Sequence, residues 1–220
     1  HSNVADWIAA GLDPAKCTIF VQSLVPEHAE LHLLLSMIVP VPWLERVPTY
    51  KELRDQLAEK DLSTYGFLGY PLLQTADIIM YNAHFVPVGE DQVPHLELSR
   101  EVVRRFHAFY GEVFVEPQPL LTRFPRLPGL DGRKMSKSYG NAIDLADDTA
   151  AVRTKVMSMY TDPARIRADI PGNVEGNPVF TYHDAFNPDA AEVEDLKARY
   201  RAGKVGHVEV KRKLIAALEL

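Results

Sequence analysis

The fold is decided by the stretch YPLLQTADIIMYNAHFVPVGEDQ, residues 70–92. Its first part, 70–83, reads as a helix entered at Pro71, because proline suits a first helical turn. HFVPV at 84–88 is a short apolar run typical of a strand, and Gly89 then turns the chain into a second helix that closes before Gly111. A helix, a strand and a helix in this order indicate an α/β layer with a parallel sheet.

The segments on either side extend this pattern. The run CTIFVQS at 17–23 predicts another buried strand, 26–39 predicts a helix, and the T-x-x-E spacing of Thr49 and Glu52 predicts a capping box at the start of a further helix. Beyond residue 145 the periodic segments are all helical. We therefore expect an α/β domain followed by an α-helical domain.

Composition limits the classes of protein that remain. The 220 residues are 46% hydrophobic and 25% charged, which is ordinary for a globular protein. A net charge of −6 argues against coating nucleic acid by bulk charge, although a local basic contact remains compatible with it. Cys17 is the single cysteine, which favours a reducing compartment, and no apolar run reaches the ~18 residues of a membrane span.

One helical stripe of polar residues stands out in the deciding stretch. Tyr70, Gln74, Asp77 and Tyr81 are spaced four, three and four residues apart, so they lie along one side of a helix whose other residues are mainly apolar. The stripe either faces solvent or forms the floor of a pocket. An ionised aspartate in apolar surroundings needs a partner, and a ligand N–H or O–H would supply one.

The turn VPVGEDQ at 86–92 is a second candidate. Ligands of open α/β sheets bind at the carboxyl ends of strands, where Gly89 would let a sugar or phosphate approach the backbone and Asp91 would accept hydrogen bonds from ribose hydroxyls. The alternative, which this segment alone favours, is an ordinary turn whose acidic residues interact with the helix dipole.

The third candidate is the cationic loop GLDGRKMSKSYGN, residues 129–141, on an otherwise acidic chain. Lys134 and Lys137 are three positions apart and can close over phosphate oxygens as mobile point charges, with Ser136 adding a hydroxyl donor. A solvated basic loop is the commoner meaning of this spacing. The histidines and the cysteine form no metal-ligand grouping, so we predict no protein-held metal.

Together the three segments resemble one family, the class I aminoacyl-tRNA synthetases. KMSKS at 134–138 is similar to the second signature of that class, while YPLLQTADI at 70–78 and VPVGEDQVPHLELSR at 86–100 look like the tryptophanyl enzymes. The resemblance implies a partial Rossmann-type parallel sheet with flanking helices over 1–145, which ends in the KMSKS loop, and part of a helical tRNA-binding domain over 146–220.

The implied activity is that of a tryptophan–tRNA ligase. Such an enzyme uses ATP with Mg²⁺ to activate L-tryptophan to an adenylate and then transfers it to tRNA(Trp); the resemblance also implies a cytoplasmic homodimer without a membrane partner. The implied amino-acid site has Asp77 at the indole N–H, with Tyr70, Gln74, Gln92, Val86 and Val88 around the substrate. The implied ATP site consists of Gly89, Asp91, Lys134, Met135, Ser136 and Lys137.

Two departures and two alternatives accompany the resemblance. The other class signature, a His-Ile-Gly-His-like segment, is absent and would belong upstream of His1, so we expect these 220 residues alone to be inactive. Leu53 stands where some relatives carry a lysine, which leaves Lys51 as the lysine of that region. The Tyr-Gln-Asp stripe also resembles tyrosyl-tRNA synthetases, and a non-catalytic synthetase-like binding protein is the alternative from another class.

Overall fold

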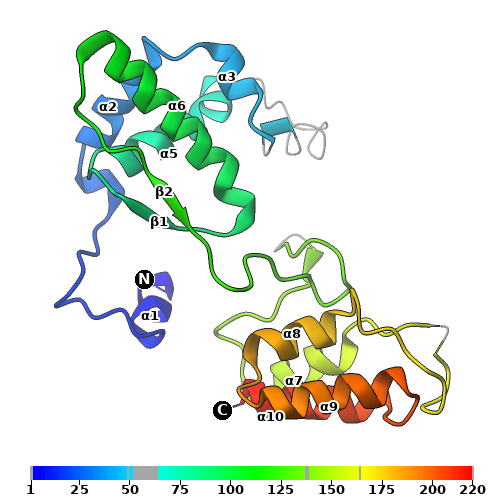
Figure 1. Cartoon of the computed structure of the whole chain (residues 1–220). Coiled ribbons are helices and arrows are strands. Elements are labelled where there is room, and N and C mark those ends of the chain that lie inside the picture. The colour runs from blue at the N-terminus through cyan, green and yellow to red at the C-terminus, as the bar shows by residue number, and fades with distance from the viewer. Residues whose placement is uncertain (1, 49, 52–63, 137–138, 164, 220) are drawn as a thin grey trace. The chain divides into compact units, whose positions relative to one another are not determined.

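The helix that carries the polar stripe is α5 (Tyr65–Ile79), and the helix after the turn is α6 (Val93–Tyr110) (Figure 1). The chain divides into two compact units, one of residues 14–126 and the other of residues 1–13 with 127–220. The computed structural model describes residues 2–48, 50–51, 64–136, 139–163 and 165–219. The predicted capping box of Thr49 and Glu52, and Leu53, lie outside these residues.

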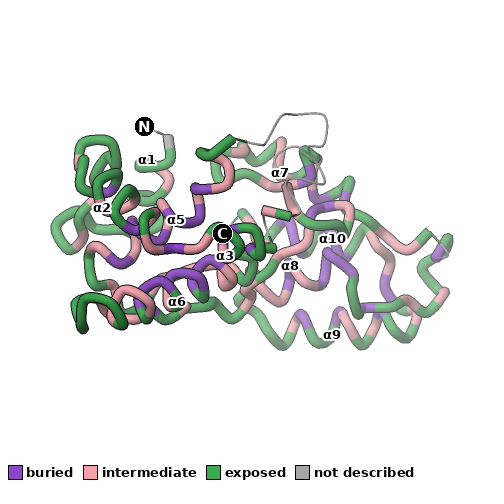
Figure 2. The backbone as a smooth tube through the Cα atoms, turned by 90° about the horizontal axis from the view of Figure 1, so that it is seen from above, coloured by how far each residue is buried: buried purple, intermediate pink, exposed green. Residues whose placement is uncertain are grey.

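The 14–126 unit is built around α5. Besides α5 and α6, its described elements are the 3₁₀ turn η1 (Gln22–Leu24), α2 (Glu27–Ser36), α3 (Val41–Glu45), β1 (Phe85–Pro87), the 3₁₀ turn η2 (Glu90–Gln92) and β2 (Gln118–Leu120). Helix α5 packs against both α2 and α6. Figure 2 shows that buried positions recur along α5 and α6, and the core there is formed by Leu35, Leu44, Leu72, Ala76, Ile79, Leu98, Val102 and Val103.

In the described part of this unit, the sheet has two strands, β1 and β2, which run parallel with Val86 opposite Pro119. The parallel sheet in a mixed α/β fold is thus confirmed, while β2 lies in a segment for which the sequence predicted no strand. Pro119 is tolerated because a strand at a sheet edge does not need every backbone N–H for pairing.

The strand expected at 17–23 is not formed in the described residues. Its last two positions belong to η1, and the side chains of Phe20 and Val21 are exposed instead of buried. A strand forms where a neighbouring strand takes up its backbone N–H and C=O groups. None of the described strands pairs with this run, so its apolar composition alone did not produce a strand.

Helix α5 begins five residues earlier than the expected start at Tyr70. Thr64 is its N-cap, and the Thr64 side chain accepts a hydrogen bond from the backbone N–H of Phe67 at 3.3 Å. Pro71 therefore lies inside the helix. The hydroxyl of Thr75 donates to the Pro71 carbonyl at 3.1 Å and lies 3.0 Å from Oγ of Ser99, which joins α5 to α6 through a buried polar pair.

The second unit is helical beyond residue 148. Helix α10 (His207–Leu218) packs against α7 (Thr149–Ser158) and α8 (Pro178–Phe186), while α9 (Ala190–Arg201) packs against α8. Three of these helices begin at an Asp or Asn whose side chain accepts a backbone N–H, and these N-caps are Asp148, Asn177 and Asp189. The short helix α1 (Ser2–Ala9) also belongs to this unit, and α8 is the helix that the sequence pattern did not reveal.

The loop with the KMSKS motif packs with these helices. Leu130 belongs to their core, together with Phe180, Tyr200 and Leu214, and Met135 packs against this core. The compact division at 126/127 differs from the domain boundary expected near 145, and the assignment of 1–145 and 146–220 to two functional domains stays a prediction. Among the described helices, none combines the length and the apolar composition needed to cross a membrane.

Candidate active site

Asp77 is the centre of a hydrogen-bonded group on the 14–126 unit. Its side chain is about one-third exposed, and Nε2 of Gln22 lies 2.8 Å and 2.9 Å from its two carboxylate oxygens. Nδ1 of the buried His28 lies 2.6 Å from Asp77 Oδ1. Two protein side chains therefore supply the partners that a half-buried carboxylate requires.

His28 connects this carboxylate to Tyr81. The other ring nitrogen, Nε2, lies 2.9 Å from the Tyr81 hydroxyl, so His28 bridges the last two residues of the polar stripe, Asp77 on α5 and Tyr81 just beyond it. Because a carboxylate only accepts hydrogen bonds, Nδ1 of His28 carries the hydrogen that points to Asp77. The ring of Phe20 lies against this pair, with centroids 5.7 Å from His28 and 5.6 Å from Tyr81.

A second chain of hydrogen bonds joins the stripe to the turn after β1. Nε2 of Gln74 donates to Oε1 of Gln92 at 3.1 Å, and Nε2 of Gln92 donates to Oδ2 of Asp91 at 2.9 Å. Gln74 and Gln92 are half-buried, whereas Asp91 is exposed. Three residues predicted from separate segments are therefore brought together, with the acidic end of the chain open to solvent.

The turn itself depends on Gly89. Its backbone is extended, and a Cβ added there would lie 2.8 Å from Asp91 Oδ1, so the missing side chain makes room for that carboxylate. Val86 and Val88, on either side of Pro87, are both half-buried. The backbone N–H groups of Glu90 and Gln92 donate to the carbonyls of Pro125 and Gly89, so both donors are used within the protein.

Tyr70 lies at the other end of the stripe. Its ring is 5.6 Å from that of His95 on α6 and 6.1 Å from that of Phe67. His95 is buried, and burial lowers the pKa of its imidazole, an effect that the negative charge of Asp91 partly opposes. The neutral imidazole and the half-buried phenol form an aromatic wall beside Gln74.

The candidate residues of the cationic loop lie on the other unit. Met135 is half-buried against the helical core, and the backbone N–H of Ser136 donates to Oδ1 of Asn141 at 2.9 Å. The carbonyl of Lys134 accepts from Nδ2 of Asn141 at 3.1 Å. Lys137 lies outside the described residues.

A carboxylate closes the base of this loop. Asp131 accepts from Nδ2 of Asn141 at 2.9 Å and from Nε of Arg133 at 2.7 Å. These hydrogen bonds lower the pKa of Asp131 to about 2, and the bond from Asn141 has the largest effect. Asp131 is therefore ionised at neutral pH, and it holds Arg133 at the start of the motif.

Sequence reasoning missed Gln22, His28 and Asn141. Gln22 belongs to the run expected as a strand and His28 to the helix expected at 26–39, and no short-range spacing links either residue to Asp77. Asn141 stands at the end of the quoted loop. Nothing in the pattern of that loop indicates that the Asn141 side chain folds back on residues 131–136. Among the described residues, no three His, Cys, Asp or Glu side chains form a group that could hold a metal.

The chain has the character of a class I aminoacyl-tRNA synthetase. It combines a small parallel sheet between helices, a carboxylate on α5 and a lysine-bearing loop. The fold is similar over 99% of this chain to the tryptophanyl-tRNA synthetase of Campylobacter jejuni, solved in complex with ADP and tryptophan, with a TM-score of 0.76, 31% identity and 66% of that chain covered.

The family model for tRNA synthetases class I (W and Y) matches residues 1–220, and the chain belongs to this family. It is 55% identical over 216 residues, 98% of its length, to a tryptophan–tRNA ligase of Treponema pallidum. It is 54% identical over 212 residues, 96% of its length, to that of Thermotoga maritima. The chain spans 64% and 65% of the lengths of these two relatives.

Proposed function

We propose that this chain is part of a tryptophan–tRNA ligase. The observation that carries the proposal is the half-buried carboxylate of Asp77, which Gln22 and His28 hold on the same helical stripe as Gln74. An oriented carboxylate is an acceptor that selects a donor ligand. The relatives of 54–55% identity, both tryptophan–tRNA ligases, support an indole N–H as that donor.

The amino-acid side of the site consists of α5 and the strand beside it. Asp77 Oδ2 accepts from Gln22 among the described residues, and a carboxylate oxygen accepts about two hydrogen bonds. The indole N–H would take the second position. Tyr70, Gln74 and Gln92 would hold the α-amino end of tryptophan, while the half-buried Val86 and Val88 would line the ring.

The nucleotide side consists of the turn and the loop. The ribose of ATP would lie at Gly89 and Asp91, since the exposed Asp91 carboxylate is an acceptor suited to hydroxyl groups. The phosphates would lie at Lys134, Met135, Ser136 and, from the family resemblance, Lys137.

The proposed reaction has two steps. A carboxylate oxygen of tryptophan attacks the α-phosphorus of ATP, a P–O bond forms, and the bond to the β-phosphate breaks with release of pyrophosphate. A tRNA 2′- or 3′-hydroxyl then attacks the carbonyl carbon: an ester bond forms, the anhydride C–O bond breaks, AMP leaves, and the hydroxyl proton passes to the leaving phosphate or to water. The first nucleophile is already ionised, so it needs no strong base, and catalysis rests on alignment and on lysine charge at the phosphates.

Mg²⁺ belongs to this proposal as a partner of the phosphates. The described part of the chain contains no acidic or histidine cluster of three, so its residues do not form a cage for the ion. This composition fits a magnesium ion that keeps water ligands and enters on the phosphate oxygens of ATP. When bound, the ion would neutralise the charge that develops on the leaving pyrophosphate.

We place the reaction in the cytoplasm and in a homodimer. Support for a second copy comes from α2 and the residue after it, where Leu33, Leu34 and Met37 are 57%, 60% and 71% exposed. Apolar side chains clustered on an exposed helix are typical of an interface. Sedimentation of the full-length protein tests this: Met37→Lys should shift the dimer toward monomer, whereas Val208→Lys, on α10, should not.

The activity is tested by ATP–pyrophosphate exchange with the full-length protein that contains this chain. Exchange with tryptophan and none with tyrosine is expected. Exchange with tyrosine alone would assign the tyrosyl specificity, and exchange with neither would favour a binding protein. Asp77→Asn should raise KM for tryptophan about 10- to 150-fold, because a hydrogen bond to a charged group contributes ~1.5–3 kcal/mol.

The matched control is Glu97→Gln on α6. It also removes one carboxylate charge from the 14–126 unit, but Glu97 is exposed and forms an ion pair with Arg100 at 3.6 Å. KM for tryptophan should stay at the wild-type value in this variant. Equal effects of the two substitutions, or none from Asp77→Asn, would refute the role of Asp77.

A further inference from the structure

We propose that Asn141 is a positioning residue that holds the backbone of residues 134–136, the described part of the KMSKS motif, in the orientation needed for phosphate binding. The proposal deepens the proposed function, on which it rests. Asn141 lies five residues beyond Ser136 and is assigned no role by the sequence motif. Its side chain would act through the backbone of Lys134 and Ser136, without touching substrate.

The amide of Asn141 is used on both of its sides. Oδ1 accepts from the backbone N–H of Ser136 at 2.9 Å, and Nδ2 donates to the carbonyl of Lys134 at 3.1 Å. These two bonds hold the peptide groups on either side of Met135. The backbone directions of Lys134 and Ser136 are therefore set by one side chain.

Asn141 also ties the loop to its own base. Nδ2 donates to Oδ1 of Asp131 at 2.9 Å, and the Asn141 carbonyl accepts from the N–H of Leu130 at 2.8 Å. Leu130 is part of the helical core, and its carbonyl accepts from Tyr160 N–H at 2.7 Å. The loop is thereby anchored through Asn141 to a rigid part of the unit.

The side-chain amide of Asn141 is buried and closely packed. The side chain of Asn141 is 5% exposed, and a Cβ added to Gly129 would lie 2.1 Å from Nδ2 and 2.5 Å from Cγ of Asn141. Glycine at 129 is thus required for the close approach of the amide, and any larger residue there would push Asn141 out of place. Gly129 and Asn141 form one fitted pair.

An amide is needed here, since both an acceptor and a donor are used. In Asn141→Asp, a carboxylate oxygen would face the Lys134 carbonyl and the ionised Asp131, neither of which donates. In Asn141→Ala, the Ser136 N–H and the Lys134 carbonyl would both lose their hydrogen bond to the Asn141 amide. In Asn141→Asp, an acceptor for the Ser136 N–H remains, and the Lys134 peptide group is released by repulsion.

The matched control is Asn177, the N-cap of α8. It is also a buried asparagine of this unit, 7% exposed, and its Oδ1 accepts from the backbone N–H of Val179 at 3.1 Å. Asn177→Ala removes a cap of the same chemistry without touching residues 128–141. A purely structural role of Asn141 would make the two alanine variants behave alike.

The experiment measures ATP–pyrophosphate exchange and thermal unfolding of the full-length protein in wild type, Asn141→Ala, Asn141→Asp and Asn177→Ala. Both Asn141 variants should lose kcat/KM for ATP by about 10- to 100-fold, with KM for tryptophan unchanged, because small misplacement of a phosphate-binding group has effects of this size. Asn177→Ala should lower the unfolding temperature and leave KM for ATP at the wild-type value.

A second readout does not depend on activity. Hydrogen exchange at the Ser136 amide should become roughly fivefold faster in Asn141→Ala, as expected for one lost hydrogen bond, and stay unchanged in Asn177→Ala. A separate outcome is no ATP–pyrophosphate exchange in the wild type together with the difference in hydrogen exchange at Ser136. In that outcome the proposed function fails, whereas the positioning of residues 134–136 by Asn141 stands. If Asn141→Ala does not fold, Asn141→Ser replaces it.

Two results would overturn the inference. One is wild-type kcat/KM for ATP in a folded Asn141→Asp or Asn141→Ala protein. The other is a fall in kcat/KM for ATP in Asn177→Ala that is proportional to its loss of stability. The effect of the Asn141 substitutions would then be one of folding alone.

Discussion

Nδ1 of His28 lies 2.6 Å from Oδ1 of Asp77, and this contact joins two helices across 49 residues of sequence. The same imidazole reaches the Tyr81 hydroxyl at 2.9 Å through its other nitrogen. His28 is buried, so its orientation is set by packing as well as by these two bonds. The carboxylate that would recognise the substrate is therefore itself held by a rigid partner.

Replacement of His28 by alanine should weaken tryptophan binding. The Asp77 carboxylate loses one of its two partners and becomes free to turn, so KM for tryptophan should rise about tenfold, which corresponds to ~1.4 kcal/mol. Pyrophosphate exchange at varied tryptophan concentration measures this. His84→Ala, which changes an exposed histidine of the same unit, is the control, and an unchanged KM in His28→Ala would contradict the role of the contact.

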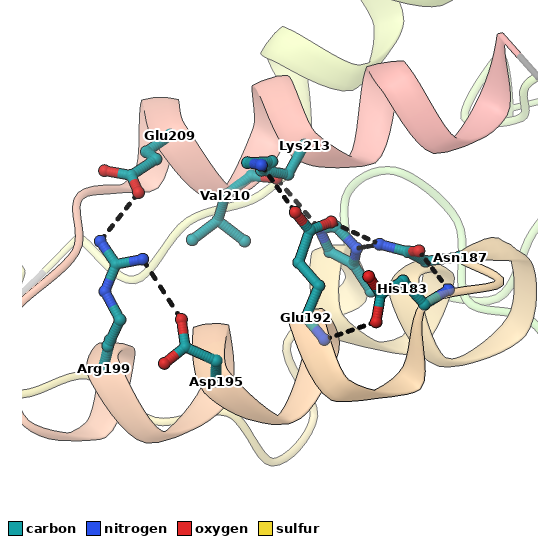
Figure 3. Close-up of polar contacts among 9 residues, drawn as sticks. His183, Asn187, Glu192, Asp195, Arg199, Glu209, Val210 and Lys213 are labelled. Carbon is teal, nitrogen blue, oxygen red and sulfur yellow. Dashed lines mark hydrogen bonds and ion pairs between the residues drawn. The ribbon is translucent and has the colours of Figure 1, made fainter.

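The stability of the helical unit should fall as the pH drops below about 6.5, the ordinary pKa of histidine. His183 is fully buried, and burial lowers the pKa of its imidazole in the folded state. The negative charges of Glu192 and Asp184 oppose this lowering of the pKa, whereas the positive charge of Lys197 adds to it. Nε2 of His183 lies 3.0 Å from the Val210 carbonyl, and Nδ1 lies 3.2 Å from Asn187 Nδ2 (Figure 3).

The sign follows from proton binding. Between pH 6.5 and the lower folded pKa, the unfolded chain binds the His183 proton and the folded chain does not, so stability is present above this window and is lost as the pH falls through it. Hydrogen exchange of amides in α8 and α10 at pH 8, 6.5 and 5 measures this unit separately. His183→Gln should reduce the loss between pH 6.5 and 5. An undiminished loss would exclude His183 as its source.

Lys211 should be more important for stability than its neighbour Lys213. The Lys211 side chain is buried, and its Nζ donates to the carbonyls of Met157 and Met159 at 2.8 Å and 2.7 Å, at the end of α7. Lys211→Met should lower the free energy of unfolding by ~1–3 kcal/mol, because two carbonyls lose their donor. Burial also lowers the pKa of this lysine.

Lys213→Met is the control for that substitution. Lys213 is exposed and pairs with Glu192 at 2.6 Å, and pairs of this kind contribute about 0–1 kcal/mol. Urea unfolding of both variants gives the comparison. Equal losses would show that the buried position of Lys211 adds nothing.

Two glycines should respond to alanine with opposite signs. A Cβ at Gly172 would lie 2.3 Å from the ring of Tyr200, so Gly172→Ala should destabilise the helical unit by about 1–3 kcal/mol through overpacking. A Cβ at Gly66, within α5, meets nothing within 4 Å, so Gly66→Ala should stabilise by about 0.5–1 kcal/mol from helix propensity. Thermal unfolding distinguishes the two, and a stabilised Gly172→Ala would contradict the packing.

Local pattern was sufficient for some elements. Gly111 follows the last turn of α6 with φ of +91°, as the sequence indicated, and Pro94 lies in the first turn of that helix. The local pattern was insufficient for the start of α5, where the N-cap Thr64 sets the boundary. It was also insufficient for residues 17–23, an apolar run with which no described strand pairs. Strand formation depends on a partner elsewhere in the chain, so composition alone does not settle it.

Residue types at short spacing were enough to predict the family, the helix with its Tyr-Gln-Asp stripe and the lysine loop. The partners that hold each functional group became visible in the folded chain alone. Gln22 and His28 reach Asp77 across 55 and 49 residues, and the Asn141 amide folds back on Lys134 and Ser136. Such contacts depend on the path of the chain and on packing that leaves room for one side chain, neither of which a local pattern records.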